Sequence, residues 1–165
     1  MIARRAGGAL LAAITLLAVA PASVRAQQRV PIAPELRIDV VGAHPTSVQG
    51  AVGVEIPAGT YMRVGVLGGA GATMDGDGSP RAAGRVDLLA RFLLDPFRQE
   101  HWGISAGAGV SLRADPGDRV RPRLLAAIDL EGRRSGTGLS PSLQIGLGGG
   151  VRGGVGLRWS GRTTR

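Results

Sequence analysis

The chain has 165 residues, of which 44% are apolar and 3% aromatic, and its 20 basic residues outnumber its 12 acidic ones. This length suits one domain rather than two. Because cysteine is absent, the chain cannot form disulfides, thiolate metal sites or a lipid-modified N-terminal cysteine. Five aromatic residues are too few for a base-stacking nucleic-acid surface, and 28 glycines disfavour a helical enzyme.

The first 26 residues have the pattern of a secretory signal peptide. Arg4 and Arg5 precede an apolar stretch over residues 6–20, and Val24 and Ala26 occupy the small-residue positions before a cleavage site. A membrane anchor is the rival interpretation, but this stretch of 15 residues, interrupted only by Thr15, would form a helix too short for a hydrocarbon core about 30 Å thick. We therefore predict cleavage after Ala26 and a single domain over residues 27–165.

Eight segments after the leader alternate apolar residues with glycine, serine or charged residues, a period of two that is typical of β-strands. They cover residues 36–43, 48–56, 61–72, 81–94, 102–115, 119–131, 139–148 and 151–160. Short turns rich in Gly, Pro and Asp separate them, and connections this short join antiparallel neighbours. The sequence therefore predicts an all-β, antiparallel, up-and-down barrel of eight strands.

The polar face of these strands mixes glycine and serine with long charged side chains. A barrel of eight strands is filled by its own side chains, so each arginine needs small neighbours, whereas a solvent-facing strand has no reason to be rich in glycine. We therefore expect the polar face to line a lumen and the apolar face to contact lipid. The reverse orientation would give a soluble periplasmic barrel with an apolar core. The expected lumen charges are Arg37, Asp39, Glu55, Arg63, Arg85, Asp87, Arg91, Arg113, Arg121, Arg123, Asp129, Glu131, Arg152 and Arg158.

The hairpin around residues 116–118 permits a prediction of register. A three-residue connection pairs residues whose numbers sum to 234, so that every apolar residue meets the apolar face of its partner strand. The predicted pairs are Asp115 with Arg119, Arg113 with Arg121, Ser111 with Arg123, Val110 with Leu124 and Ala106 with Ile128. This register crowds arginines together, so we expect acids from other strands, such as Asp39, Glu55 or Asp87, to reach across and plug the lumen.

The leader, the eight strands and the charged lumen resemble the small eight-stranded outer-membrane barrels of Gram-negative bacteria, the class of the OmpA transmembrane domain and OmpX. The resemblance covers about residues 36–159, and Val155, Leu157 and Trp159 match the alternating apolar residues and terminal aromatic of that class. It implies a transmembrane β-barrel whose partners are outer-membrane lipid and the barrel-insertion machinery. Because odd strands start where even strands finish, the aromatic residues expected at one rim are Tyr61, Phe97, Trp102 and Trp159.

Residues capable of catalysis or metal binding are sparse. His44 with Ser47 is the one pair that resembles part of a lipid-modifying barrel hydrolase, and no carboxylate is suitably placed to complete it. Two separated histidines, His44 and His101, do not make a metal site, and Asp75 and Asp77 lack the later ligands of a calcium loop. We therefore predict no enzyme activity, no metal and no cofactor.

Some arginines fall outside the strand pattern. Arg133, Arg134, Arg162 and Arg165 are placed to contact lipid headgroups or peptidoglycan, with a solubilising role as the simpler interpretation. Together these features predict an outer-membrane barrel with a structural role or a narrow, plugged channel. The alternatives are a soluble periplasmic barrel that binds a small apolar ligand and, less favoured, a barrel enzyme that modifies lipid.

Overall fold

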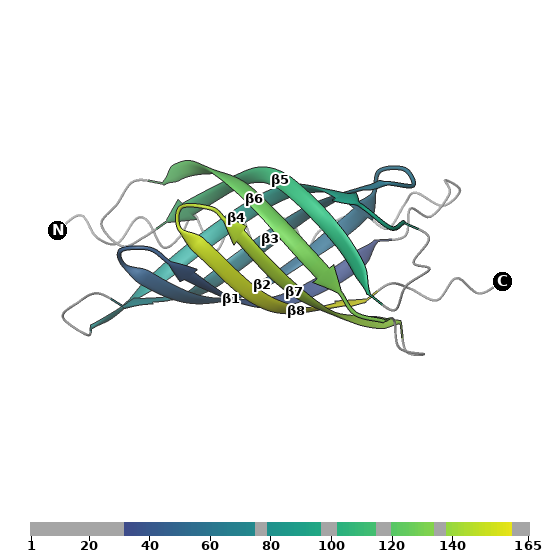
Figure 1. The fold of residues 1–165 in the computed structure, drawn as a ribbon. Helices are drawn as coiled ribbons and strands as arrows, with labels where there is room; N and C mark the ends of the chain where they lie inside the picture. Colours follow the sequence, from purple (N-terminus) through teal and green to yellow (C-terminus); the bar gives the residue numbers. More distant parts are fainter. Residues whose placement is uncertain (1–31, 75–78, 97–101, 115–119, 134–137, 160–165) are drawn as a thin grey trace, which may run out of the picture.

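The computed structural model describes residues 32–74, 79–96, 102–114, 120–133 and 138–159 (Figure 1). The leader predicted over residues 1–26 lies outside these ranges. No helix among the described residues is long and apolar enough to cross a bilayer. The described chain forms eight strands: β1 (Ala33–Gly42), β2 (Thr46–Pro57), β3 (Met62–Met74), β4 (Pro80–Leu93), β5 (Gly103–Ala114), β6 (Arg121–Glu131), β7 (Leu139–Leu147) and β8 (Val151–Trp159).

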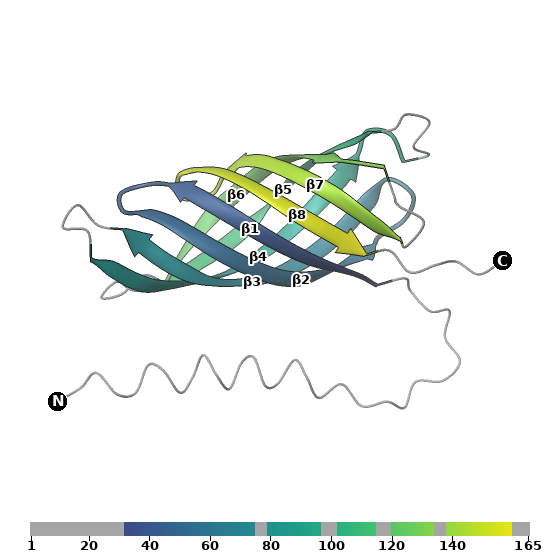
Figure 2. The same cartoon turned by 90° about the horizontal axis from the view of Figure 1, so that it is seen from below.

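The strands form one closed antiparallel barrel in the order of the sequence. Each strand pairs with the strands before and after it, and β1 pairs with β8 from Glu35 opposite Arg158 to Gly42 opposite Val151. Figures 1 and 2 show the strands tilted around a common axis, with β1 and β8 side by side at the point of closure. The predicted all-β, eight-stranded, up-and-down architecture is confirmed.

The β5–β6 hairpin has the predicted register. Val110 lies opposite Leu124, Ala106 opposite Ile128 and Arg113 opposite Arg121. The predicted pairing of Asp115 with Arg119 falls outside the described residues. Three strands, β1, β2 and β4, begin one to three residues earlier than the alternation predicts. Because β1 begins at Ala33, Glu35 belongs to the barrel wall.

Side chains alternate strictly between the two faces of the wall. In β1, Glu35, Arg37 and Asp39 are buried, whereas Leu36 and Ile38 are 45% and 57% exposed. The same alternation runs through the other strands, so the polar positions face the barrel interior and the apolar positions face outward. Most of the largest fully buried side chains are therefore polar, although Leu67 and Leu89 also face the interior.

The two rims of the barrel differ in shape. We call the end with Ala33 and Trp159 the terminal rim, and the end with Gly42 and Val151 the distal rim. At the distal rim the β5–β6 ladder extends to Arg121, whereas the β6–β7 ladder ends at Ala126 opposite Leu147. Residues 121–125 of β6 therefore project beyond β7, and we call them, together with the residues 109–113 of β5 that pair with them, the projecting hairpin.

Candidate functional site: the charged barrel interior

Twelve charged side chains from six strands, β1, β2, β3, β4, β6 and β8, meet inside the barrel. All of them are buried except Arg63, which is partly exposed. Each carboxylate contacts at least two guanidinium groups, so the described interior is electrically balanced. The six carboxylates belong to Glu35, Asp39, Glu55, Asp87, Asp129 and Glu131, and the six guanidinium groups to Arg37, Arg63, Arg85, Arg91, Arg152 and Arg158.

Arg91 of β4 connects three strands across the lumen. Its Nε atom donates to Asp129 of β6 at 3.0 Å, and its Nη1 atom lies 3.4 Å from Glu35 of β1. Arg91 also pairs with Glu55 of β2. A buried guanidinium that satisfies three carboxylates is costly to remove, because each carboxylate would lose a compensating charge.

A second cation, Arg158 of β8, shares the partners Glu35 and Glu55 with Arg91 and lies nearer the terminal rim. Its Nε atom is 2.8 Å from Glu55, its Nη2 atom is 3.4 Å from Glu35, and it also pairs with Glu131. Arg63 of β3 approaches from the rim and donates to Glu131 at 2.8 Å. Glu55 and Glu131 thereby tie together strands that are not neighbours in the wall.

Arg37 of β1 occupies the middle of the interior. Its Nη2 atom lies 2.9 Å from both Glu35 and Asp129. Gln144 accepts a hydrogen bond from Arg37 and donates from its Nε2 atom to Asp129 at 3.0 Å. Arg37 Nε is also 3.9 Å from Asp39, so this residue connects the charges near the terminal rim with those near the distal rim.

The cluster nearer the distal rim is built on two aspartates. Asp39 pairs with Arg85 and lies 3.1 Å from Arg152, while Asp87 lies 3.1 Å from Arg85 and 2.8 Å from Arg152. Ser111 donates a hydrogen bond of 2.6 Å to Asp87. This arrangement joins β1, β4, β5 and β8 through side chains alone.

Inward glycines leave the space that the arginines occupy. A Cβ atom on Gly69 would lie 3.2 Å from the Cγ atom of Arg85, and one on Gly65 would lie 3.3 Å from Nη1 of Arg91. A Cβ on Gly107 would come within 3.1 Å of Cγ of Arg91. The abundance of glycine on the inward face therefore has a steric reason, because a narrow interior cannot hold both a long side chain and a bulky neighbour.

Three residues predicted to line the lumen are not buried in it. Arg121 and Arg123 are exposed and Arg113 is half-buried, because they sit on the projecting hairpin, where β7 is not present to close the wall. The expectation that acids such as Asp39, Glu55 or Asp87 compensate these arginines stays a prediction. Those acids pair with arginines deeper in the barrel.

The sequence analysis missed several polar residues of the interior. Glu35 is not among the predicted residues because the first strand is predicted to begin at Leu36, the residue after it. In the structure Glu35 contacts Arg37, Arg91 and Arg158. Gln49, which accepts a hydrogen bond of 3.0 Å from Arg85, and Gln144 were missed because only charged residues were considered. Their inward position in the alternation is the signal that identifies them.

The aromatic residues gather at the terminal rim on the outer face. Tyr61 and Trp102 are exposed, as is Trp159 at the end of β8. Tyr61 stacks on Phe92, an aromatic residue not included in the prediction, with ring centroids 5.9 Å apart. The fourth predicted residue, Phe97, lies outside the described residues.

The pair His44 and Ser47 does not converge on one surface. His44 is exposed in the β1–β2 connection, whereas Ser47 is fully buried and faces the interior. His101, Asp75 and Asp77 lie outside the described residues. Within the described ranges, no group of three or more His, Cys, Asp or Glu residues is arranged to hold a metal ion.

The chain was also compared with known proteins. No protein-family model matches it, and no curated protein does so either.

Proposed function

We propose that this protein is an exported outer-membrane β-barrel with a structural role or a narrow, plugged channel. The observation that carries the proposal is the composition of the outer face. In the described strands no Arg, Asp or Glu occupies an outward position, and Thr46 is the one polar side chain there. Each strand exposes at least two large apolar residues. An apolar surface around a whole circumference favours a lipid environment over water.

Strand length and aromatic placement support the same proposal. The strands have 9 to 14 residues, and a tilted strand of about 9–11 residues is long enough to cross a hydrocarbon core. Exposed aromatic residues near one rim resemble the girdles that occur at membrane interfaces. The partners in this proposal are outer-membrane lipid and the barrel-insertion machinery, with lipid headgroups or peptidoglycan as further contacts of Arg133, Arg134, Arg162 and Arg165.

The plugged state is proposed from the interior. The ion pairs cross the lumen between strands that are not neighbours, and inward glycines let the arginines fill the space between them. An interior of eight strands is only wide enough for side chains. Such a barrel does not offer an aqueous path to a solute.

Separation of inner and outer membranes by density tests the location. The full chain, with its own leader, is expressed in a Gram-negative host, and we expect it in the outer-membrane fraction beginning at Gln27. We also expect unheated and heated samples to migrate differently in detergent gels, because a closed barrel resists unfolding in cold detergent. Recovery as a soluble periplasmic protein would contradict the proposal and favour the carrier alternative.

Planar-bilayer recordings test the plugged lumen. We expect no large current steps from the purified barrel, because charged side chains occupy the described interior. Large and stable ion currents from a preparation that contains this protein alone would show an open pore. That outcome would retain the membrane location and overturn the plugged state.

A further inference from the structure

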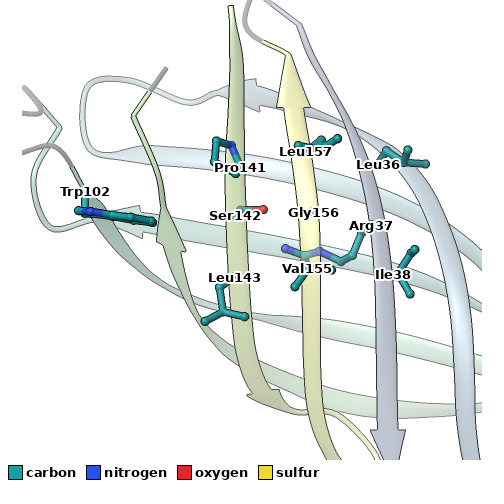
Figure 3. A pocket seen from close by; sticks show the side chains of 10 residues that line it. All are labelled: Leu36, Arg37, Ile38, Trp102, Pro141, Ser142, Leu143, Val155, Gly156 and Leu157. Carbon is teal, nitrogen blue, oxygen red and sulfur yellow. The ribbon is translucent and has the colours of Figure 1, made fainter. Parts of the chain in front are cut away.

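An apolar groove lies on the outer face near the terminal rim. It has a volume of about 410 Å³ and crosses β7, β8 and β1. Figure 3 shows the side chains around it, with the indole of Trp102 on one side and the aliphatic residues of the three strands opposite. Its outward walls are Pro141 and Leu143 of β7, Val155 and Leu157 of β8, Leu36 and Ile38 of β1, and Trp102.

Register explains how the groove is formed. Leu36 lies opposite Leu157 and Leu157 opposite Pro141, so one row of outward residues runs across the three strands. The row continues to Gly132, whose N–H donates to the Pro141 carbonyl at 2.8 Å. A Cβ on Gly132 would come within 2.8 Å of Pro141 and 3.3 Å of the Trp102 ring. Glycine at this position therefore lets the indole lie close to the wall and form one side of the groove.

The residue after Gly132 adds a charge to this apolar site. Arg133 is exposed and lies beyond the end of β6, and in the chain it follows directly the glycine that packs against Trp102. A groove lined by hydrocarbon, with an exposed arginine one residue after Gly132, complements a molecule with an apolar chain and an anionic head. Tryptophan and arginine are both suited to the boundary between hydrocarbon and water.

We propose that this groove holds one acyl chain of an anionic membrane phospholipid, whose phosphate contacts Arg133. The inference rests on the proposed membrane location and makes it more specific, because it distinguishes one lipid site from the general lipid contact of the outer face. The head group supplies the charge that Arg133 complements, and the acyl chain contacts Leu143, Val155 and Leu157.

Two single-tryptophan variants test the proposal. Trp159→Phe leaves Trp102 as the reporter beside the groove, and Trp102→Phe leaves Trp159 at the same rim. Each is reconstituted into zwitterionic phosphatidylcholine vesicles that contain a minor fraction of phosphatidylglycerol with brominated acyl chains, which quench tryptophan on contact. An exposed arginine enriches anionic lipid about fivefold, so we expect Trp102 to be quenched several times more strongly than by the same fraction of brominated phosphatidylcholine. The difference between the two lipids should be smaller for Trp159, which does not line the groove.

Three further variants, made in the background that retains Trp102, locate the effect. Arg133→Gln should remove the preference for phosphatidylglycerol, whereas Arg123→Gln, at the distal rim, should leave it intact. Val155→Phe should fill the groove and reduce quenching, and Val110→Phe, on an outward position of β5, serves as its control. Equal quenching of Trp102 by the two brominated lipids would overturn the proposal.

The same samples separate failure of the inference from failure of the proposed function. In vesicles of fully brominated phosphatidylcholine, a membrane barrel should show quenching of both tryptophans. Absence of any quenching there would contradict the membrane location itself. If deletion of residues 160–165 increased the quenching of Trp102, the chain's own tail would be the occupant of the groove, which would also overturn the lipid assignment.

Discussion

Arg91 and Arg123 both occupy inward positions of the wall, but their surroundings differ completely. Arg91 is 1% exposed and pairs with carboxylates from three strands. Arg123 is exposed on the projecting hairpin, and its side chain passes the β7–β8 turn at Gly149. The comparison shows that alternation determines which face a side chain occupies, whereas burial also requires a complete wall on the opposite side.

The largest difference in the free energy of unfolding is expected between a variant that lacks Arg91 and a variant that lacks Arg123. Arg91→Met removes one of the compensating charges of three buried carboxylates and should destabilise the barrel by about 3–5 kcal/mol. Arg123→Met should change the free energy of unfolding by no more than about 0.5 kcal/mol, as is usual for exposed residues. Urea titrations of both variants in lipid vesicles measure the difference. Similar unfolding midpoints would mean that the buried network does not stabilise the closed wall.

The outer face should show a gradient from the middle of the barrel to the projecting hairpin. Ile128 is 60% exposed within the part of β6 that pairs with β7, and Leu124 is 86% exposed beyond it. Ile128→Arg should cost about 2–4 kcal/mol, and Leu124→Arg should approach the cost of about 0–1 kcal/mol found near the interface. Refolding into vesicles at several urea concentrations provides both values. If both substitutions were harmless, the outer face would not contact lipid.

The loss of stability on neutralising an acid should also depend on where the acid lies. Asp87→Asn weakens the contacts with Arg85, Arg152 and Ser111, and hydrogen bonds to charged groups contribute about 1.5–3 kcal/mol. Asp77→Asn is the control, since Asp77 lies in the β3–β4 connection, outside the described residues. We expect little change in its free energy of unfolding. A urea titration with equal midpoints for these two variants would contradict the role of Asp87 in the interior.

The smallest changes in the free energy of unfolding are expected from glycine-to-alanine substitutions, with opposite signs on the two faces of the wall. A Cβ on inward Gly109 would overlap the carbonyl oxygen of Leu88, whereas a Cβ on outward Gly50 would meet no atom within 4 Å. Gly109→Ala should therefore cost about 1–3 kcal/mol. Gly50→Ala should stabilise the barrel by about 0.5–1 kcal/mol, because glycine weakens a strand. Thermal or urea unfolding in vesicles measures whether each variant is more or less stable than the wild type. Higher stability of both variants would mean that the barrel interior has room for a Cβ atom at position 109.

Much of the fold could be predicted because it depends on local patterns. The alternation around Val110 defines a strand, and the short connection after β5 fixes the register with Leu124. The partners inside the lumen could not be predicted in the same way. The pairing of Arg91 with Asp129, or of Arg152 with Asp87, depends on the tilt and stagger of the closed wall. Neither property is visible in any single strand.

At the rim, the exposure of residues on the projecting hairpin could not be predicted from the alternation either. Arg121 and Arg123 continue the alternation of β6 without interruption, so nothing local separates them from Asp129. Their exposure follows from the end of the β6–β7 ladder at Ala126. The length of a neighbouring strand therefore decides the environment of a residue that the alternation places correctly. The groove beside Trp102 is equally non-local, because it requires β5, β7, β8 and β1 together.

The seam between β1 and β8 has a consequence for assembly. Every other ladder joins consecutive strands and can form early, as a hairpin. At the seam, Arg152 meets Asp39 and Arg158 meets Glu35 across 113 and 123 residues of sequence. An unfinished sheet would thus carry half-neutralised guanidinium groups and an unpaired backbone edge, both of which are costly in hydrocarbon. For the outer-membrane barrel proposed above, we therefore expect release into the bilayer to wait until the first and last strands have paired.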